Sequence, residues 1–367
     1  MGYLSDLEKI VKINSYTNNK SGVDEVGLLF DIWLENLGFS TTIYVREDIG
    51  NHRHYKSQHD GTSKKLLLLG HIDTVFPPQK FEDYKEDEHW IYGAGVCDMK
   101  GGNIVALQAL RELKKENIEI KNIDVLLVSD EETGSDDSKH LTSELAANYD
   151  YCFVYEAAGE NMEVVTGRKG VGTFFVETQG KAAHAGNSYT KGHDANLEAS
   201  YKLQELVKLT NLEKGTTVNV GKIIGGIGAN TISPHANLVF ELRYKVASER
   251  DRVLSEINKI IETSYVYGTV STLTGGIQRD VMQTSESSLS LIKSIESICD
   301  VKITSEERGG VSDANIVSSC GVVTLDGFGP FGDGDHTIHE RANKDSFVSR
   351  IALSKKLFKH FIEKSNF

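Results

Sequence analysis

Apolar residues along this chain recur in two patterns, one with helical spacing and one in continuous runs. Helical spacing predicts helices over residues 4–13, 22–37, 102–116 and 138–147. The continuous apolar runs at 64–69, 123–128 and 151–155 are typical of strands buried on both faces of a sheet, and residues 39–46 alternate like a further strand. Because these strands alternate with helices, we expect an α/β domain whose parallel or mixed sheet is covered on both sides.

The pattern changes after residue 168. The order of elements becomes strand, helix, strand, strand, helix, strand, over residues 173–179, 194–210, 217–224, 237–244, 249–264 and 269–274. This is the split βαβ arrangement of a small α+β sandwich. Alternating helices and strands resume beyond Gly276, and 367 residues exceed the size at which one core keeps growing. We therefore expect two domains, with residues 169–278 inserted between residues 1–168 and 279–367 of a larger α/β domain.

Residues 51–65 between the predicted strands are polar and rich in turn-forming residues. The stretch contains His52, His54 and His59, which could suggest a metal site. A polar loop between two strands is the favoured interpretation of this stretch.

Polar side chains follow three of the predicted buried strands directly. His71 and Asp73 follow the first, Asp130, Glu131 and Glu132 follow the second, and Glu156 follows the third. Ligand sites in open α/β sheets lie outside the carboxyl ends of the strands. The three strand ends are therefore expected to meet at one crevice.

Imidazole and carboxylate groups are the ligands that suit a first-row divalent metal, and two such ions close together need a bridging carboxylate. Asp98, in the glycine-rich segment GAGVCDMKGG, is the natural bridge. Taken alone, Asp98 could cap the helix that follows it, and Glu131 and Glu132 could be solvated loop acids. Their joint placement after successive strands favours a metal site, in which one acid of the adjacent pair binds metal and the other acts as general base. Cys97, next to Asp98, is expected to have a packing role.

The composition limits the kinds of partner that the protein is expected to bind. With 40 basic and 53 acidic residues, the net charge is −13, which argues against nucleic acid or an anionic membrane as partner. The four cysteines are widely spaced and are expected to be reduced thiols. Neither a signal peptide nor an apolar run of about 20 residues is apparent, so a cytoplasmic protein is the expectation.

Several motifs together resemble the M20 metallopeptidase family, especially its glutamate carboxypeptidase branch. They are GHIDTVFP at 70–77, GAGVCDMKGG at 93–102, SDEETGS at 129–135 and YEAAG at 155–159. Later segments agree, namely GKAAHAG around His184, GGIGANTISP around Asn230, ERGGVSDA around Arg308 and GPFGDGDHTIHE around His336. The resemblance covers essentially the whole chain and is more specific for the family than for the substrate.

The resemblance implies a site with two zinc ions, with cobalt and manganese as alternatives. Asp98 would bridge the ions, His71 and Glu156 would complete one, and Glu132 and His336 the other. His339 is the alternative to His336. The resemblance further implies that Asp73 orients His71 and that Glu131 is the general base.

The inserted domain is implied to be a lid and dimerisation module, which predicts a homodimer. His184 would be its catalytic histidine, acting in its own chain or across the dimer. Asn230, Arg243 and Arg308 match positions that hold substrate, although a surface ion pair explains Arg243 almost as well.

The implied activity is hydrolysis of an amide bond in a small peptide or N-acyl amino acid with a free carboxylate, by a water that bridges the two zinc ions. Glu156, where aminopeptidase-like members have Asp, favours the carboxypeptidase and deacylase side. A deacylase of the acetylornithine or succinyl-diaminopimelate type is the alternative, and a non-catalytic metal-dependent binding protein is a further one. A nucleotide-binding protein is disfavoured because no GxGxxG or GxxxxGK[ST] motif follows a strand.

Overall fold

The structure, a computed structural model, describes residues 2–367 and divides into two compact units. Unit 1 comprises Met1–Gly167, Thr284–Arg308 and Ser312–Phe367, and unit 2 comprises Arg168–Gln283 and Gly309–Val311. The insertion expected at residues 169–278 thus begins one residue after, and ends five residues before, the long segment of unit 2.

The centre of unit 1 is a six-stranded sheet with the order β1-β2-β6-β3-β7-β14. Its strands are β1 (Ser40–Tyr44), β2 (His52–Lys56), β3 (Leu66–His71), β6 (Ile123–Val128), β7 (Tyr151–Val154) and β14 (Val323–Leu325). β6, β3, β7 and β14 run parallel, whereas β1 and β2 add an antiparallel edge. This arrangement confirms the predicted mixed sheet, and every residue of β3 and β6 is buried as their continuous apolar sequences require.

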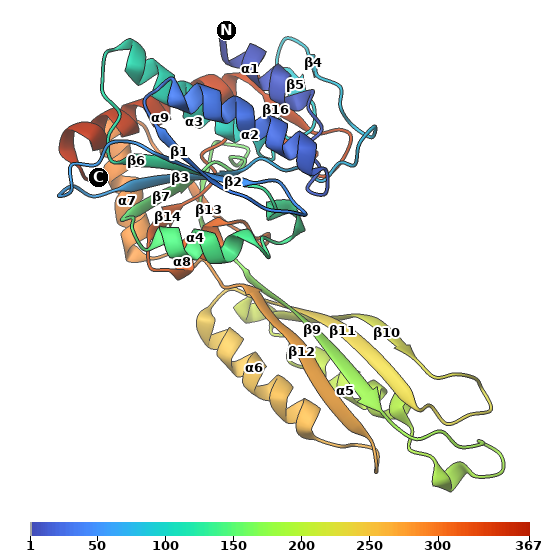
Figure 1. Ribbon diagram of the computed structural model, residues 1–367. Helices are drawn as coiled ribbons and strands as arrows, with labels where there is room; N and C mark the ends of the chain where they lie inside the picture. Colours follow the sequence, from blue (N-terminus) through green and yellow to red (C-terminus); the bar gives the residue numbers. More distant parts are fainter. Residues whose placement is uncertain (1) are drawn as a thin grey trace. The chain divides into compact units, whose positions relative to one another are not determined.

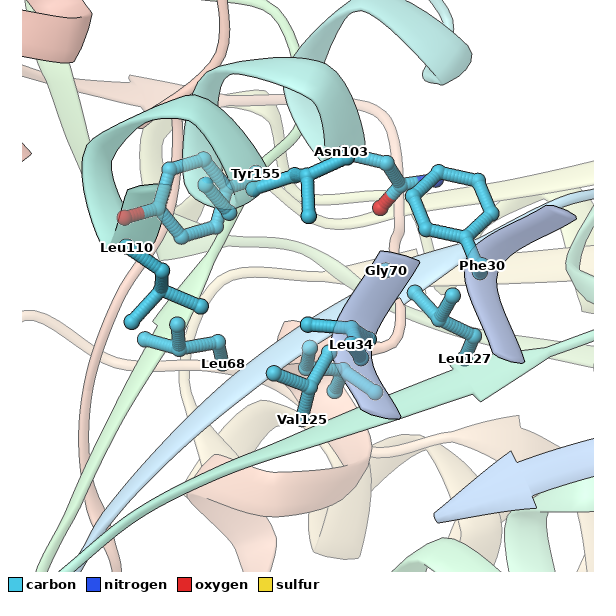
Figure 2. Close-up of a pocket in the computed structure, with 12 residues that line it drawn as sticks. Phe30, Leu34, Leu68, Gly70, Asn103, Leu110, Val125, Leu127 and Tyr155 are labelled. Atoms are coloured by element: carbon cyan, nitrogen blue, oxygen red, sulfur yellow. The ribbon is translucent and has the colours of Figure 1, made fainter. Parts of the chain in front are cut away.

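Helices cover both faces of this sheet (Figure 1). α1 (Gly2–Val11), α2 (Lys20–Glu35), α3 (Lys100–Lys115) and α9 (Lys344–Lys364) lie on one face, and α4 (Ser138–Ala146) and α8 (Ala314–Ser319) on the other. α7 (Glu286–Cys299) packs against α9 and β14. Figure 2 shows the apolar packing between α2, α3 and the central strands, where Phe30 lies close to Gly70 and Leu110 lies close to Leu68.

Two smaller sheets complete unit 1. One has the order β15-β16-β5-β4, formed by β15 (Gly332–Asp333), β16 (Arg341–Asn343), β5 (Trp90–Tyr92) and β4 (Lys85–Glu86). The other pairs β8 (Val164–Arg168) with β13 (Ser305–Arg308). In the first of these sheets, β16 brings the segment around residue 336 beside the segment that follows β5.

The prediction of a loop at residues 51–65 is wrong over its first part, because β2 is a buried strand between β1 and β6. Its side chains are polar, but several of the buried ones have polar partners on other elements. Arg53 pairs with Asp31, and the His52 imidazole lies 2.9 Å from a carboxylate oxygen of Asp137. The sequence pattern shows that these residues are polar, but it does not show the partners that allow a polar strand to be buried.

The buried imidazole of His54 gives the stability of unit 1 a pH dependence. Its Nε2 lies 2.8 Å from the Tyr149 hydroxyl, which donates to Asp124, and its Nδ1 has no partner among the described residues. Burial lowers the pKa of His54 to about 4 despite the opposing charge of Asp124, and Lys56 and His59 lower it further. The unfolded chain binds this proton near pH 6.5, so His54 supports folding above that pH. About 3 kcal/mol of this support is lost as the pH falls from about 6.5 to about 4.

We expect His54→Gln to remove this part of the pH dependence. Trp33 and Trp90, the two tryptophans of the chain, both lie in unit 1, so their fluorescence during urea unfolding reports on that unit. Between pH 7 and pH 4.5 the variant should lose about 2 kcal/mol less stability than the parent chain. The exposed His140 provides a control, since His140→Gln should leave the loss unchanged. Equal losses in the parent and His54→Gln would contradict the assignment.

Unit 2 has the predicted split βαβ arrangement, which the structure confirms. Its elements are β9 (Gly170–Gln179), α5 (Ala195–Val207), β10 (Thr217–Gly225), β11 (His235–Tyr244), α6 (Ala247–Glu262) and β12 (Val270–Arg279). The antiparallel sheet has the order β10-β11-β9-β12, and both helices pack on one face over a core that includes Phe174 and Phe240. Within residues 2–367, none of the helices has the length and apolar character needed to cross a membrane.

Candidate metal centre

His71 stands at the carboxyl end of β3 and is almost completely buried. Its Nδ1 lies 3.0 Å from the backbone oxygen of Asp73, so this nitrogen carries a proton and Nε2 faces the centre. The Asn103 amide donates to the His71 carbonyl at 2.6 Å from above Gly70 (Figure 2). A Cβ at Gly70 would lie 2.1 Å from the Asn103 side-chain oxygen, so this position requires glycine.

Asp73 connects the ends of two strands. Its carboxylate accepts the backbone N–H groups of Glu131 and Glu132 at 3.3 and 3.2 Å, and the Thr17 hydroxyl at 2.7 Å. Thr17 is buried and was not among the predicted site residues. It lies in the polar segment after α1, where the sequence contains no pattern that predicts such a contact. Asp73 therefore fixes both the His71 loop and the segment that carries the two adjacent acids.

Asp98 lies between two imidazoles. Its Oδ1 is 3.1 Å from Nε2 of His71, and its Oδ2 is 3.3 Å from Nε2 of His336. Each oxygen of one carboxylate thus faces a different histidine, which is the arrangement that a ligand shared between two ions requires.

Two further carboxylates extend this group at its ends. Glu156 Oε1 lies 3.7 Å from Nε2 of His71, and Glu132 Oε2 lies 3.2 Å from Nε2 of His336. Among the described residues, ligand atoms of His71, Asp98 and Glu132 all lie within 4.8 Å of one another. The structure therefore brings all five predicted metal ligands together within unit 1, in the two sets that the family resemblance implied.

The imidazoles in this group are stabilised in their charged form. Burial alone would lower the pKa of His71, but hydrogen bonds with Asp73 and Asp98 raise it well above its usual range. Hydrogen bonds with Asp98 and Glu132 raise the pKa of His336 to about 11. Without another cation, protons on the histidines balance the acids, so metal binding has to release them.

The carboxylates at the two ends are instead stabilised in their neutral form. Burial and the negative charge of Asp98 raise the pKa of Glu132 to about 7. The same two causes raise the pKa of Glu156 well above its usual value, and the charge of Glu131 adds to this effect. Acids that crowd together at this cost are the signature of a site built for a cation.

Glu131 opens a short 3-10 turn, Glu131–Thr133, between β6 and α4. Its negative charge contributes to the raised pKa of Glu156. Its backbone is held by Asp73, as described above. Glu131 is thus next to the cluster without being one of the five side chains that form it.

The structure brings His336, and not His339, to the cluster. His336 has a left-handed backbone conformation with φ of 60°, following Gly334 with φ of 77°. A non-glycine residue in this conformation costs about 1 kcal/mol or more and is often found at a functional site. His339 is exposed, and its backbone N–H donates to the Thr337 hydroxyl.

The predicted substrate residue Arg308 lies in unit 1, near the third strand end. It donates to the carbonyl of Ala157, which follows Glu156, at 2.9 Å and also pairs with Glu306. Arg243 lies in unit 2, where it pairs with Glu241. This contact agrees with the alternative interpretation of Arg243 as part of an ion pair.

His184 and Asn230 are exposed and lie on neighbouring segments of unit 2. The Ala185 backbone N–H donates to the Asn230 carbonyl at 2.9 Å. Nδ1 of His184 accepts two backbone N–H groups, from Gly186 and Asn187, at 3.1 and 3.2 Å. The neutral ring therefore carries its proton on Nε2, which can act as a donor.

Cys97 is fully buried and its Sγ packs against Gly332. Burial, together with the charges of Asp335 and Glu340, raises the pKa of its thiol well above the usual value. A thiol of this kind is inert, in agreement with the packing role expected for it.

Residues 67–360 match the peptidase family M20/M25/M40. The chain belongs to this family. Carboxypeptidase G2 from Pseudomonas sp. (strain RS-16) is 30% identical over 70% of this chain and 63% of its own length. An acetylornithine deacetylase from Vibrio campbellii is 28% identical over 58% of each chain. In both comparisons the M20 chain described here spans less than two thirds of the relative's length.

Solved structures agree on the fold. Aminopeptidase PepT from Bacillus cereus superposes with a TM-score of 0.83 at 19% identity, covering 99% of this chain and 98% of that one. A Bacillus subtilis protein described as a dinuclear metal binding peptidase from the M20 family superposes with a TM-score of 0.73 at 13% identity, covering 99% and 98%. The M20 fold, with its two units, is therefore established for this chain.

Proposed function

We propose that this M20 protein is a hydrolase that uses two zinc ions to cleave an amide bond next to a free carboxylate, in a small peptide or an N-acyl amino acid. The observation that carries the proposal is the position of Asp98, with one oxygen facing His71 and the other facing His336. Family membership supports the hydrolase class, and the site geometry supports two ions.

The donor set fits zinc. Two imidazole nitrogens and three carboxylates are borderline-to-hard ligands, and their raised and lowered pKa values reflect charges that a divalent cation would neutralise. His71 and Glu156 would hold one ion, Glu132 and His336 the other, and Asp98 both. When bound, the ions would polarise the scissile carbonyl and make a water nucleophilic near neutral pH.

The chain's own groups would handle the protons. Glu131 would remove a proton from the attacking water and then donate it to the leaving amine, because it lies beside the ligand cluster without belonging to it. Asp73 would hold Glu131 and His71 in position through the hydrogen bonds described above. His184 would donate its Nε2 proton to the carbonyl oxygen, in its own chain or across a dimer.

The carboxylate of the substrate needs a cationic partner. Arg308 is suited to this role because a guanidinium can bind a carboxylate through two N–H groups, and it adjoins the residue after Glu156. Asn230 and Arg243 would add further polar contacts from unit 2. Similarity to an acetylornithine deacetylase supports a small-metabolite deacylase as the second candidate.

We also propose that unit 2 serves as the lid and forms a homodimer. β10 is an edge strand of its sheet, and Ile223 and Ile224 on it are half exposed. Unpaired edges with apolar side chains are suited to pairing with a second copy of the chain.

A substrate panel tests the proposed function. The protein is loaded with zinc, cobalt or manganese and assayed with N-acyl glutamates, dipeptides and N-acetylornithine. We expect the N-acyl glutamates and dipeptides to be cleaved with the highest kcat/KM. Faster cleavage of N-acetylornithine would favour the deacylase, and no cleavage of any substrate with any metal would contradict the proposal.

A further inference from the structure

Glu340 is a buried carboxylate for which neither the motifs nor the proposed mechanism provides a role. It is 1% exposed. Its Oε2 accepts the backbone N–H of Gly95 at 2.9 Å, and its Oε1 accepts the backbone N–H groups of Cys97 and Asp98 at 3.0 and 3.1 Å. One side chain thus binds three backbone donors of the loop that carries Asp98.

The surrounding backbone ties Glu340 to both ligand segments. The Gly93 N–H donates to the Glu340 carbonyl at 3.3 Å, at the point where the Asp98 loop leaves β5. The next residue, Arg341, begins β16 and pairs with Tyr92, the last residue of β5. His336 lies four residues before Glu340 in the same short segment. A shift of Glu340 would therefore move one ligand relative to the other.

A carboxylate is well matched to this position. Its two oxygens can accept several N–H groups at once. A side chain with a single acceptor would leave at least one buried N–H unsatisfied, at a cost of about 1–3 kcal/mol. The loop needs such an acceptor because its own turn leaves these three N–H groups pointing at one place.

The geometry points to Glu340 as a positioning residue that holds the Asp98 carboxylate between His71 and His336, so that each oxygen faces one imidazole. This inference rests on the proposed two-zinc site and adds to it a residue that determines metal affinity. Glu340 touches neither substrate nor metal in this role. Its effect reaches the site through the backbone of residues 95–98.

Glu340→Gln separates this role from a contribution to folding alone. The amide keeps the shape but turns one acceptor into a donor, so at least one of the three N–H groups loses its partner. We expect the zinc affinity, measured by competition with a chromophoric chelator, to fall about 10–100-fold. At saturating zinc, kcat should recover most of its parent value, because the ligands and Glu131 are unchanged.

Glu198→Gln is the matched control. Glu198 is a buried glutamate of unit 2, 1% exposed, which accepts the backbone N–H groups of Tyr265 and Val266 at 2.8 and 2.6 Å and pairs with Lys202. Its replacement should destabilise the chain but change the zinc affinity less than twofold. If Glu340→Gln does not fold, Glu340→Asp, which keeps the charge but is one methylene shorter, is measured with the same expected direction.

The outcomes separate this inference from the proposed function. If the parent chain itself fails to bind two zinc ions, the proposed metal site fails. If the parent binds two ions and Glu340→Gln, or Glu340→Asp in its place, binds them equally well, the positioning role is overturned. An equal loss of affinity in Glu198→Gln would also overturn it, because the effect would then be general to the loss of a buried carboxylate.

Discussion

Replacing Glu131 with glutamine is expected to lower kcat by about 10²–10⁴-fold, the usual contribution of a general base, while two zinc ions stay bound. The amide cannot take the proton from the attacking water. The backbone N–H of residue 131 still donates to Asp73, so the Asp73 loop should keep its position. The measurement combines steady-state kinetics with the zinc content of the purified protein.

Replacing the adjacent acid, Glu132, is expected to change the zinc content as well as the activity. Glu132 contacts His336 directly, so Glu132→Gln should release zinc as well as lose activity. Two neighbouring glutamates would then give opposite metal contents with equal loss of turnover. If Glu131→Gln retains parent activity, or loses its zinc as Glu132→Gln does, the assignment of the base is wrong.

The ligand set could be predicted because each ligand sits where a strong local pattern ends. His71, Glu132 and Glu156 follow continuous apolar strands, and parallel strands present their carboxyl ends at one edge of a sheet. Asp98 and His336 instead lie in glycine-rich segments; the need for a bridging carboxylate indicated Asp98, and the family resemblance indicated His336. The positions of the strand ends and the family resemblance thus together indicate these five residues.

The supporting residues could not be predicted, since their partners are distant in sequence. Thr17 reaches Asp73 across 56 positions, and Glu340 reaches Gly95 across 245. Threonines and glutamates are common on any surface, and nothing local distinguishes one that is buried against a backbone loop. Only the folded arrangement of the chain reveals these contacts.

The ion pair of Arg243, by contrast, has a signal in the sequence. Glu241 and Arg243 are two residues apart on β11, so their side chains share one face of the strand, and their ion pair follows from that spacing. The buried strand β2 was harder to predict, because its sequence HRHYK lacks the apolar run of β3. It is held by polar partners that lie on α2, at the residue just before α4 and in the segment after α4.

Asp98→Asn is expected to have the largest effect on the metal site, reducing bound zinc from two ions per chain to one or fewer. An amide has one oxygen, so its NH₂ group would face His71 or His336, and a donor cannot ligate a cation. Loss of the shared ligand removes several kcal/mol of charge stabilisation, and each 1.36 kcal/mol is tenfold in rate. We therefore expect turnover to fall by about 10³-fold or more. Zinc at about 1,000 times its Kd should stabilise the parent by about 4 kcal/mol and the variant far less.

Asp31→Asn provides the comparison for this variant. Asp31 is a buried acid of α2 that accepts from Tyr55 and pairs with Arg53, so its loss should destabilise unit 1 without changing the metal site. Zinc content measured after dialysis, together with thermal unfolding with and without zinc, should show two ions in Asp31→Asn and at most one in Asp98→Asn. Two tightly bound ions in Asp98→Asn would mean that another residue bridges them. The two-zinc arrangement around Asp98 would then have to be abandoned, even if the protein proved to be an active hydrolase.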